Sequence, residues 1–482
     1  MTKRDSFSIP GVAGFAALIV SIALAVAGPV HAQATNPPRE PAPTNAKPSA
    51  AVDELPRGVI VDRVVCAADP SQSYALYMPS TYTKERAWPI VYCFEPAARG
   101  RLPVEHFQAA AERFGWIVVT SWNSRNGSMA RSVDAGSAMW RDTHERFRID
   151  DRRVYTSGFS GGARVATLVA MSCGGCIAGV IACGAGFPDT VYAIEKQTPD
   201  KLRFAYFATV GVEDFNFSEL SALGPTLERL NVTHRVARFE GAHEWAPSEL
   251  LVEAAAWMEI EAIRSGARVT DAGLVDALYD ESIARARALE AAGRVFDAWQ
   301  LFESARRQYS GLRAVAEADA GARALAGDRR VKDSVKIDRE EVKRQNRIAG
   351  EAAVWARARQ DQEIRVEAIA EFRRRIEDLR TKARSKTESS ERRVARRTLN
   401  LLFANYYEGG NSAALSGNHV KAVEMLEVAV EIAPRYAGSY LALAGQRFKT
   451  GDRRKAMESL GQGLEKLAEW ATINTAAVKK PG

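Results

Sequence analysis

Two patterns of apolar residues divide the chain near residue 265. Before this point, short apolar runs typical of strands alternate with segments whose apolar residues recur every three or four positions, the spacing of one helix face. The predicted strands are 58–66, 73–78, 88–94, 116–120, 154–159, 179–183, 204–210 and 234–239, and the predicted helices are about 104–114, 130–147, 160–171, 218–230 and 247–263. Because two strands precede the alternation, we expect an antiparallel hairpin at the edge of a mostly parallel sheet.

Beyond residue 265 the pattern is helical. Residues 417–422 align with residues 451–456 at a period of 34, Leu426 then matches Leu460, and Pro434 closes the first unit. A similar glycine-to-alanine interval recurs at 293–298. This part of the chain, 267–482, resembles a tetratricopeptide-repeat region, whose helices stack in pairs.

A highly charged segment, about 328–397, separates these repeat-like units. Its apolar residues alternate at spacings of three and four, which predicts a long amphipathic or coiled-coil helix; they are Ile369, Phe372, Ile376, Leu379 and Ala383. The arginine runs 373–375 and 392–397 have two interpretations. They could bind an anionic polymer or lipid headgroups, or they could form a helix face exposed to solvent. Neighbouring acidic residues favour the solvated face.

Composition indicates a soluble, multidomain protein. The chain has 482 residues, too many for one ordinary domain, with 46% hydrophobic and 26% charged residues. The net charge of +7 comes from 66 basic and 59 acidic residues that are interspersed, so it does not argue for nucleic-acid binding.

The N-terminus predicts export. Lys3 and Arg4 precede an apolar run at about 12–27, and small residues allow cleavage after Ala32 or Ala34. We therefore expect a signal peptide over 1–34, a flexible linker over 35–56, and a periplasmic or secreted mature protein without a membrane span. A retained anchor is the weaker alternative, because the apolar run is short for a span.

The five cysteines are odd in number, so at least one is unpaired if pairing is internal. Cys173 and Cys176 are close enough in sequence to close a small loop in an oxidising compartment. Cys93 and Cys183 fall in predicted strands and are expected to be buried as small apolar residues.

The segment 154–166 reads as strand, sharp turn and helix, with Ser160 at the turn between Gly158 and Gly162. Gly-x-Ser-x-Gly is a weak signal alone, but the serine follows the fifth of eight predicted strands. In this layout the chain resembles the α/β-hydrolase superfamily, and Gly-Phe-Ser-Gly-Gly-Ala-Arg is similar to secreted esterases of the polyhydroxybutyrate-depolymerase and feruloyl-esterase type. The resemblance implies an α/β fold over 57–266 with Ser160 as the nucleophile.

Asp214 and His243 complete the predicted catalytic set. They follow the seventh and eighth strands, in the order serine, acid, histidine of this superfamily. The resemblance makes His243 the general base and Asp214 the residue that orients it. Glu213 is the alternative acid. His234 begins the last strand, at the wrong end of the sheet, while His106 and His144 lie in helical segments and read as structural.

The loop after the third strand is where this kind of hydrolase supplies half of an oxyanion hole. Pro96 has no N–H, so Ala97 is the expected donor, joined by the amide of Gly161. Glu95 is expected to orient the loop.

The predicted substrate-binding residues are Trp122, Phe187 and Trp245, although packing is the safer expectation for Trp245. The chain leaves no room for a lid between Ser160 and Asp214, so an open cleft is expected, suited to small acyl or aromatic esters and to the ends of polymer esters.

The predicted function is an exported serine hydrolase that cleaves carboxylic esters through an acyl-enzyme, with no metal or cofactor. The helical part is expected to bind a protein partner, and 57–266 to fold and act without it. A non-catalytic envelope binding or assembly protein, and a peptidase on the same fold, are the alternatives; the ester, the partner and the oligomeric state stay open.

Overall fold

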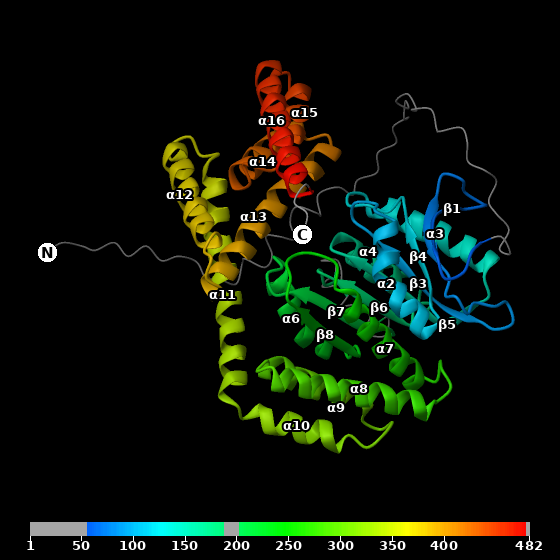
Figure 1. Ribbon diagram of the computed structural model, residues 1–482. Coiled ribbons are helices and arrows are strands. Elements are labelled where there is room, and N and C mark those ends of the chain that lie inside the picture. Colours follow the sequence, from blue (N-terminus) through cyan, green and yellow to red (C-terminus); the bar gives the residue numbers. More distant parts are fainter. Residues whose placement is uncertain (1–54, 188–201, 479–482) are drawn as a thin grey trace.

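The computed structural model describes residues 55–187 and 202–478. The predicted signal peptide and almost all of the predicted linker lie outside these ranges. The first half of the described chain forms a sheet covered by helices, and the second half is helical (Figure 1).

The sheet has eight strands in the order β1-β2-β4-β3-β5-β6-β7-β8. The strands are β1 (Ile60–Val65), β2 (Ser73–Tyr77), β3 (Trp88–Phe94), β4 (Ile117–Ser121), β5 (Ile149–Phe159), β6 (Gly179–Cys183), β7 (Ala205–Gly211) and β8 (His234–Phe239). The β1–β2 and β2–β4 pairs are antiparallel, and the others are parallel. The predicted eight strands and edge hairpin are confirmed, and this is an α/β-hydrolase fold.

Helices cover both faces of the sheet. One face packs on α3 (Met129–Arg146), α4 (Gly161–Ser172) and α6 (Phe217–Arg229), and the other on α2 (Arg101–Phe114) and α7 (Ser248–Arg264). Along β3, Ile90 and Phe94 belong to the first core and Val91 and Cys93 to the second. Burial on both faces explains why the strands read as continuous apolar runs.

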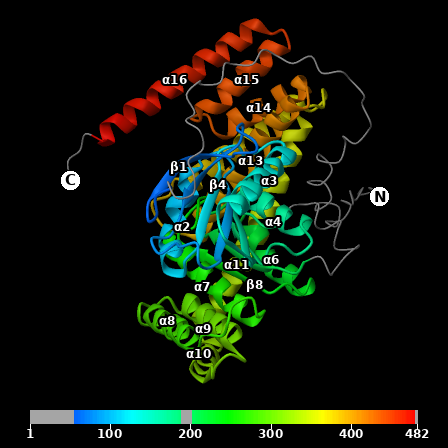
Figure 2. The ribbon, with the colours of Figure 1, turned by 90° about the vertical axis from the view of Figure 1, so that its right-hand side faces the viewer.

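The helical half wraps around the sheet domain. Its members are α8 (Ala272–Ala291), α9 (Val295–Tyr309), α10 (Ala316–Ala326), α11 (Arg329–Ala358), α12 (Arg365–Ala383), α13 (Ser390–Leu415), α14 (His419–Ile432), α15 (Ala437–Lys449) and α16 (Arg453–Val478). Ile260 and Ile263 of α7 share a core with α8–α10, and Val342 of α11 packs on the core of the sheet domain. Helix α11 then leads from α8–α10 to α12–α16 (Figure 1), and α16 projects away from the rest (Figure 2). No helix in the described ranges has the length and apolar character to cross a membrane.

The charged segment 328–397 does not form the single long helix expected from its periodicity. It contains α11, α12 and the start of α13, with breaks at 359–364 and 384–389. In the break at 359–364, the Asp361 side chain accepts a hydrogen bond of 3.0 Å from the backbone N–H of Glu363. In the second, Ser389 caps α13 by accepting from the Arg392 N–H at 3.2 Å. Polar side chains that bond to the backbone compete with helix propagation, which the apolar spacing does not reveal.

The repeat-like units are helix hairpins. Gly417 precedes α14 and Gly451 precedes α16, and both have positive φ, 77° and 86°. The next residues, Asn418 and Asp452, cap these helices. The side chain of each accepts a hydrogen bond of 3.1 Å from the backbone N–H of the residue three positions later in the chain. The 34-residue interval is therefore repeated in local structure, whereas membership of the tetratricopeptide class stays a prediction.

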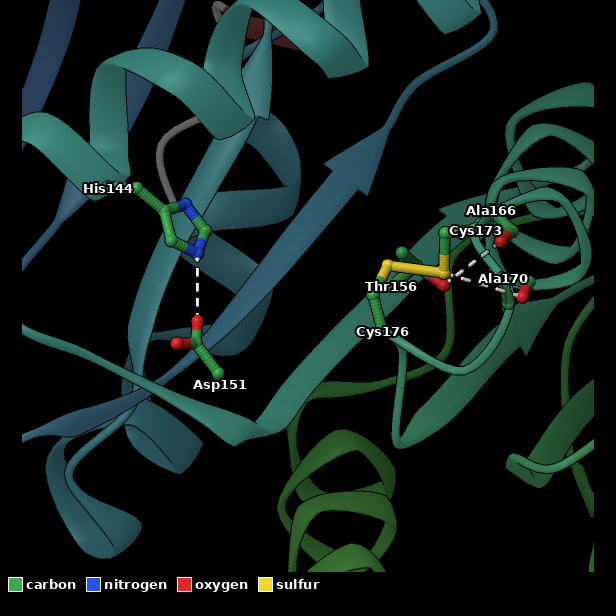
Figure 3. The surroundings of a disulfide bond; sticks show 7 residues. All are labelled: His144, Asp151, Thr156, Ala166, Ala170, Cys173 and Cys176. Atoms are coloured by element: carbon green, nitrogen blue, oxygen red, sulfur yellow. Dashed lines mark hydrogen bonds and ion pairs between the residues drawn. A yellow bond between two sulfur atoms is a disulfide. The ribbon is translucent and has the colours of Figure 1, made fainter.

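Cys173 and Cys176 form a disulfide between the end of α4 and the loop before β6 (Figure 3). Cys66, Cys93 and Cys183 are free and buried. Burial raises the pKa of all three thiols, that of Cys66 to about 12, so they stay protonated in the folded protein.

Candidate active site

Ser160 lies at the tip of a sharp turn between β5 and α4. Its φ of 52° and ψ of −121° are rarely adopted by L residues and cost on the order of 1–3 kcal/mol. A Cβ on Gly158 would lie 2.2 Å from the Gly162 carbonyl oxygen, and one on Gly162 would lie 2.0 Å from the Phe94 carbonyl oxygen. The Ser160 N–H donates to the Cys183 carbonyl oxygen at 2.8 Å, which fixes the turn to β6. Both flanking glycines are therefore required.

The structure brings together the three side chains predicted as a triad. His243 Nε2 lies 2.8 Å from Ser160 Oγ, and His243 Nδ1 lies 2.9 Å from Asp214 Oδ1. The Asp214 carboxylate can only accept a hydrogen bond, so Nδ1 carries the proton and Nε2 is left with a lone pair that faces the serine hydroxyl. This geometry allows His243 to remove the Ser160 proton.

Asp214 is completely buried in the loop after β7. Burial raises the pKa of its carboxyl, and the hydrogen bonds from His243 and from the Asn216 N–H oppose this rise. Gly184, at φ +66°, covers the pair: a Cβ there would lie 3.2 Å from Asp214 Oδ2 and 3.3 Å from His243 Cε1. The absence of a side chain at 184 thus leaves room for the acid and the histidine.

Two aromatic rings contact the imidazole. The ring centroids of Phe159 and Phe215 lie 4.5 and 4.0 Å from that of His243. The His243 side chain is only 17% exposed, so little water competes with its hydrogen bonds to Ser160 and Asp214.

The two predicted oxyanion donors differ in their surroundings. Gly161 is the first residue of α4, where an amide has no acceptor within the helix. The Ala97 N–H instead donates to Glu95 Oε2 at 2.7 Å, and the Arg99 N–H donates to the same oxygen at 3.0 Å. Glu95 is fully buried and orders this loop, as expected, but it occupies the Ala97 amide. In this structure Gly161 is therefore the better placed donor.

The three side chains predicted to bind substrate have packing or hydrogen-bond partners within the protein. Phe187 is 2% exposed and packs edge-on against Tyr206, so it belongs to the core. Trp245 is 5% exposed and packs on Phe159, which corrects the substrate prediction in favour of packing. The Trp122 side chain donates through its indole Nε1 to the Asp62 carbonyl oxygen of edge strand β1 at 2.6 Å.

Glu213 and His234, the alternative acid and base, form no hydrogen bond to Ser160, His243 or Asp214 through their side chains. Glu213 pairs with Arg396 of α13 at 2.7 and 3.0 Å. His234 Nδ1 lies 2.9 Å from the Val232 carbonyl oxygen at the start of β8. Both residues have structural partners away from Ser160.

The remaining two candidate histidines also have structural surroundings. His106 stacks on Trp245, with centroids 6.0 Å apart. His144 Nδ1 lies 2.7 Å from the Trp140 carbonyl oxygen, and its Nε2 lies 3.2 Å from Asp151 Oδ1 (Figure 3).

Helix α13 reaches the loops around the nucleophile. Asn126, in the loop after β4, lies so close to Gly161 that a Cβ there would be 1.9 Å from Asn126 Oδ1. The Asn126 amide donates to Glu408 of α13 at 3.5 Å. Leu415, at the end of α13, lies beside Gly127. The helical half therefore borders the loops around Ser160, on a side that was expected to be open.

Several residues of the site were not predicted from the sequence: Phe215, Gly184, Asn126, Glu408 and Arg397. Only the arginine run 392–397 gave a signal, and it was assigned to a solvated face. In the structure Arg393, Arg396 and Arg397 all pair with buried or half-buried acids.

The described residues contain no group of three or more histidines, cysteines or acids placed to hold a metal ion. No protein-family model matches the chain, and no curated protein matches its sequence.

Similar solved structures share low sequence identity with this chain. A ferulic acid esterase is 16% identical, with 42% of this chain and 97% of that chain covered and a TM-score of 0.37. S-formylglutathione hydrolase from Staphylococcus aureus is 14% identical, over 39% and 90%, with a TM-score of 0.33. Est1E from Butyrivibrio proteoclasticus is 13% identical, over 40% and 95%, with a TM-score of 0.32.

Proposed function

We propose that this protein is a serine hydrolase that cleaves carboxylic esters. The observation that carries the proposal is the continuous hydrogen-bonded series Asp214, His243 and Ser160, with distances of 2.9 and 2.8 Å. The strained backbone of Ser160 adds support, because such strain is retained where the surrounding structure requires one side-chain position.

The proposed mechanism begins when Ser160 Oγ attacks the ester carbonyl carbon and His243 Nε2 accepts its proton. Asp214 stabilises the resulting imidazolium, and the Gly161 amide donates to the oxyanion. His243 then protonates the departing alcohol, which leaves an acyl group on Ser160. Water, deprotonated by the same histidine, releases the acid and restores the serine.

Labelling with a fluorophosphonate, followed by hydrolysis of a panel of p-nitrophenyl esters, tests this proposal. Ser160 should carry the label, and Ser160→Ala should abolish labelling and turnover. An unlabelled chain that hydrolyses none of the esters would favour the non-catalytic binding or assembly protein. Labelling with cleavage of peptide amides in preference to esters would favour the peptidase.

We propose in addition that the protein is exported and that its signal peptide is removed after Ala32 or Ala34. The Cys173–Cys176 disulfide supports an oxidising compartment. Mass measurement of the mature protein tests this, since the chain should begin at Gln33 or Thr35.

We also propose that α14–α16 bind a protein partner. Exposed apolar side chains on these helices support the proposal; they include Val420, Phe448 and Met457, which are 63–66% exposed. Affinity capture with the wild-type protein and with Phe448→Ser tests it: a partner lost on substitution supports the proposal.

A further inference from the structure

The loop that carries Asp214 is held by the helical half on both sides of the catalytic acid. Arg397 of α13 donates through Nε to the Val212 carbonyl oxygen at 2.7 Å, and its Nη2 donates to the same oxygen. Gln345 of α11 donates to the Phe215 carbonyl oxygen at 2.8 Å. The two carbonyls that flank Asp214 thus accept hydrogen bonds from residues far along the chain.

Arg397 is held firmly in place. It is 1% exposed, and its Nη1 donates at 2.9 Å to Glu341 of α11, which is also 1% exposed. Its guanidinium lies over the Phe217 ring, with the central carbon 3.7 Å from the centroid. Arg393 pairs with the same Glu341. A buried guanidinium with this many partners is rigid, and the loss of one partner leaves an uncompensated buried charge.

The other side of the loop contacts the histidine loop. The Val212 N–H donates to the Phe239 carbonyl oxygen at 2.9 Å, and the Glu213 N–H donates to the Gly241 carbonyl oxygen at 2.8 Å. The acid loop therefore lies between the loop that carries His243 and the Arg397–Glu341 pair. A shift toward the helical half would lengthen the 2.9 Å hydrogen bond between Asp214 and His243.

We infer that Arg397 is a positioning residue of the catalytic centre and that α11 and α13 are a structural part of it. The inference rests on the proposed hydrolase function. Arg397 touches neither Ser160 nor His243; it acts through the Val212 carbonyl oxygen on the position of Asp214. Misplacement of a catalytic group by about 1 Å can reduce turnover by about 100-fold.

The test uses the full chain with Arg397→Met, Arg397→Lys and Gln345→Leu, and with p-nitrophenyl acetate as substrate. We expect Arg397→Met to lower kcat about tenfold or more while KM changes less than about threefold, because in the proposed mechanism Asp214 acts on the imidazole and not directly on the substrate. Arg397→Lys should have a kcat between those of Arg397→Met and the wild type. An ammonium group cannot hydrogen-bond to Val212 and Glu341 at the same time in the way that the planar guanidinium does. Arg374→Met is the matched control, since Arg374 is an exposed arginine of α12 paired with Glu371.

A double variant separates positioning from general stability. If Arg397 acts through Asp214, Arg397→Met should cost little in the Asp214→Asn background, so that the two losses are far from multiplicative. Multiplicative losses, or a folded Arg397→Met with wild-type kcat, would overturn the inference. If Arg397→Met does not fold, Gln345→Leu takes its place. It is measured in the wild-type and Asp214→Asn backgrounds, and multiplicative losses again overturn the inference. Full activity of Ser160→Ala would instead overturn the proposed function, so the two failures are distinguishable.

Discussion

Arg397 Nε lies 2.7 Å from the carbonyl oxygen of Val212, although 185 positions separate the two residues in the chain. Val212 is two residues before Asp214, so the half of the protein that supplies no triad residue fixes the segment that supplies the acid. The helical half is on this evidence more than an appended binding module.

Removal of the helical half should abolish activity. A variant that ends at residue 266 exposes Ile260 and Ile263 and loses the contacts to Val212 and Phe215. We expect it to aggregate or to hydrolyse p-nitrophenyl acetate at least about 100-fold more slowly than the full chain. This reverses the sequence-based expectation that 57–266 acts alone.

A variant that ends at Gly451 is the control for this truncation. It lacks only Asp452, α16 and the residues that follow α16, and α16 packs on α15. It should keep full activity. An active variant ending at residue 266 would show that the hydrolase domain holds its acid loop without help.

The triad should behave as one unit. Ser160→Ala and His243→Ala should each lower kcat by several orders of magnitude, and the double variant should be scarcely worse, because a base has no role without its nucleophile. Asp214→Asn should fold and still lose most activity, since an amide favours the wrong imidazole tautomer.

Steady-state kinetics with one ester can check these roles. Glu213→Gln and His234→Ala serve as comparison variants and should retain most activity, because their partners lie away from Ser160. Multiplicative losses in the Ser160 and His243 double variant would show that the roles are wrongly assigned.

Glu261 should make stability depend on pH. Its side chain on α7 is 14% exposed, and burial raises the pKa of its carboxyl from 4.5 to about 7, opposed by Arg264. The folded state therefore holds a proton that the unfolded state releases between these values, so stability falls as pH rises from about 4.5 to about 7. Across this pH range the free energy of unfolding falls by at most about 3 kcal/mol.

Thermal unfolding of Glu261→Gln at pH 5 and pH 8 tests this. The substitution should reduce the decrease in Tm between the two values, because the amide does not titrate. Glu145→Gln, at an exposed position of α3, should leave the decrease unchanged. An unchanged decrease in Glu261→Gln would show that other groups govern the pH dependence.

Glu408 should favour esters with a cationic group. It accepts a hydrogen bond from Asn126, which lies beside Gly161, and its carboxylate stands at an exposed position of α13 where it can attract a cation. Acetylcholine and its neutral analogue 3,3-dimethylbutyl acetate provide a matched pair. Glu408→Gln should lower the ratio of their kcat/KM values by up to about fivefold, the size of an exposed ion pair. An unchanged ratio would place the cationic group away from α13.

Local sequence patterns were sufficient to predict the sheet domain. The inner strands β3, β4 and β6 are buried throughout, so each is an apolar run, and the turn at Ser160 is enforced by glycines whose role is visible in the sequence. Because parallel strands bring their carboxyl ends to one edge, the positions of Asp214 and His243 after β7 and β8 were enough to suggest that they meet.

Contacts between the two halves left no comparable pattern. Arg397 and Glu341 are buried, yet both occur in segments where charged residues are the majority. A pairing across 56 positions depends on how α11 and α13 pack, not on local spacing. Phe187 shows the converse case: an aromatic residue predicted to lie in a loop is buried in local packing. Trp245 is also buried, as the safer expectation for it had been.

The three free cysteines can be used to measure how often the sheet domain opens. Cys66 follows β1, Cys93 lies in β3 and Cys183 in β6, and each is buried. An alkylating reagent can modify them only when the surrounding strands separate. The rate of alkylation at each thiol, read by peptide mass spectrometry, would therefore measure how often the edge and the centre of the sheet open, without any introduced label.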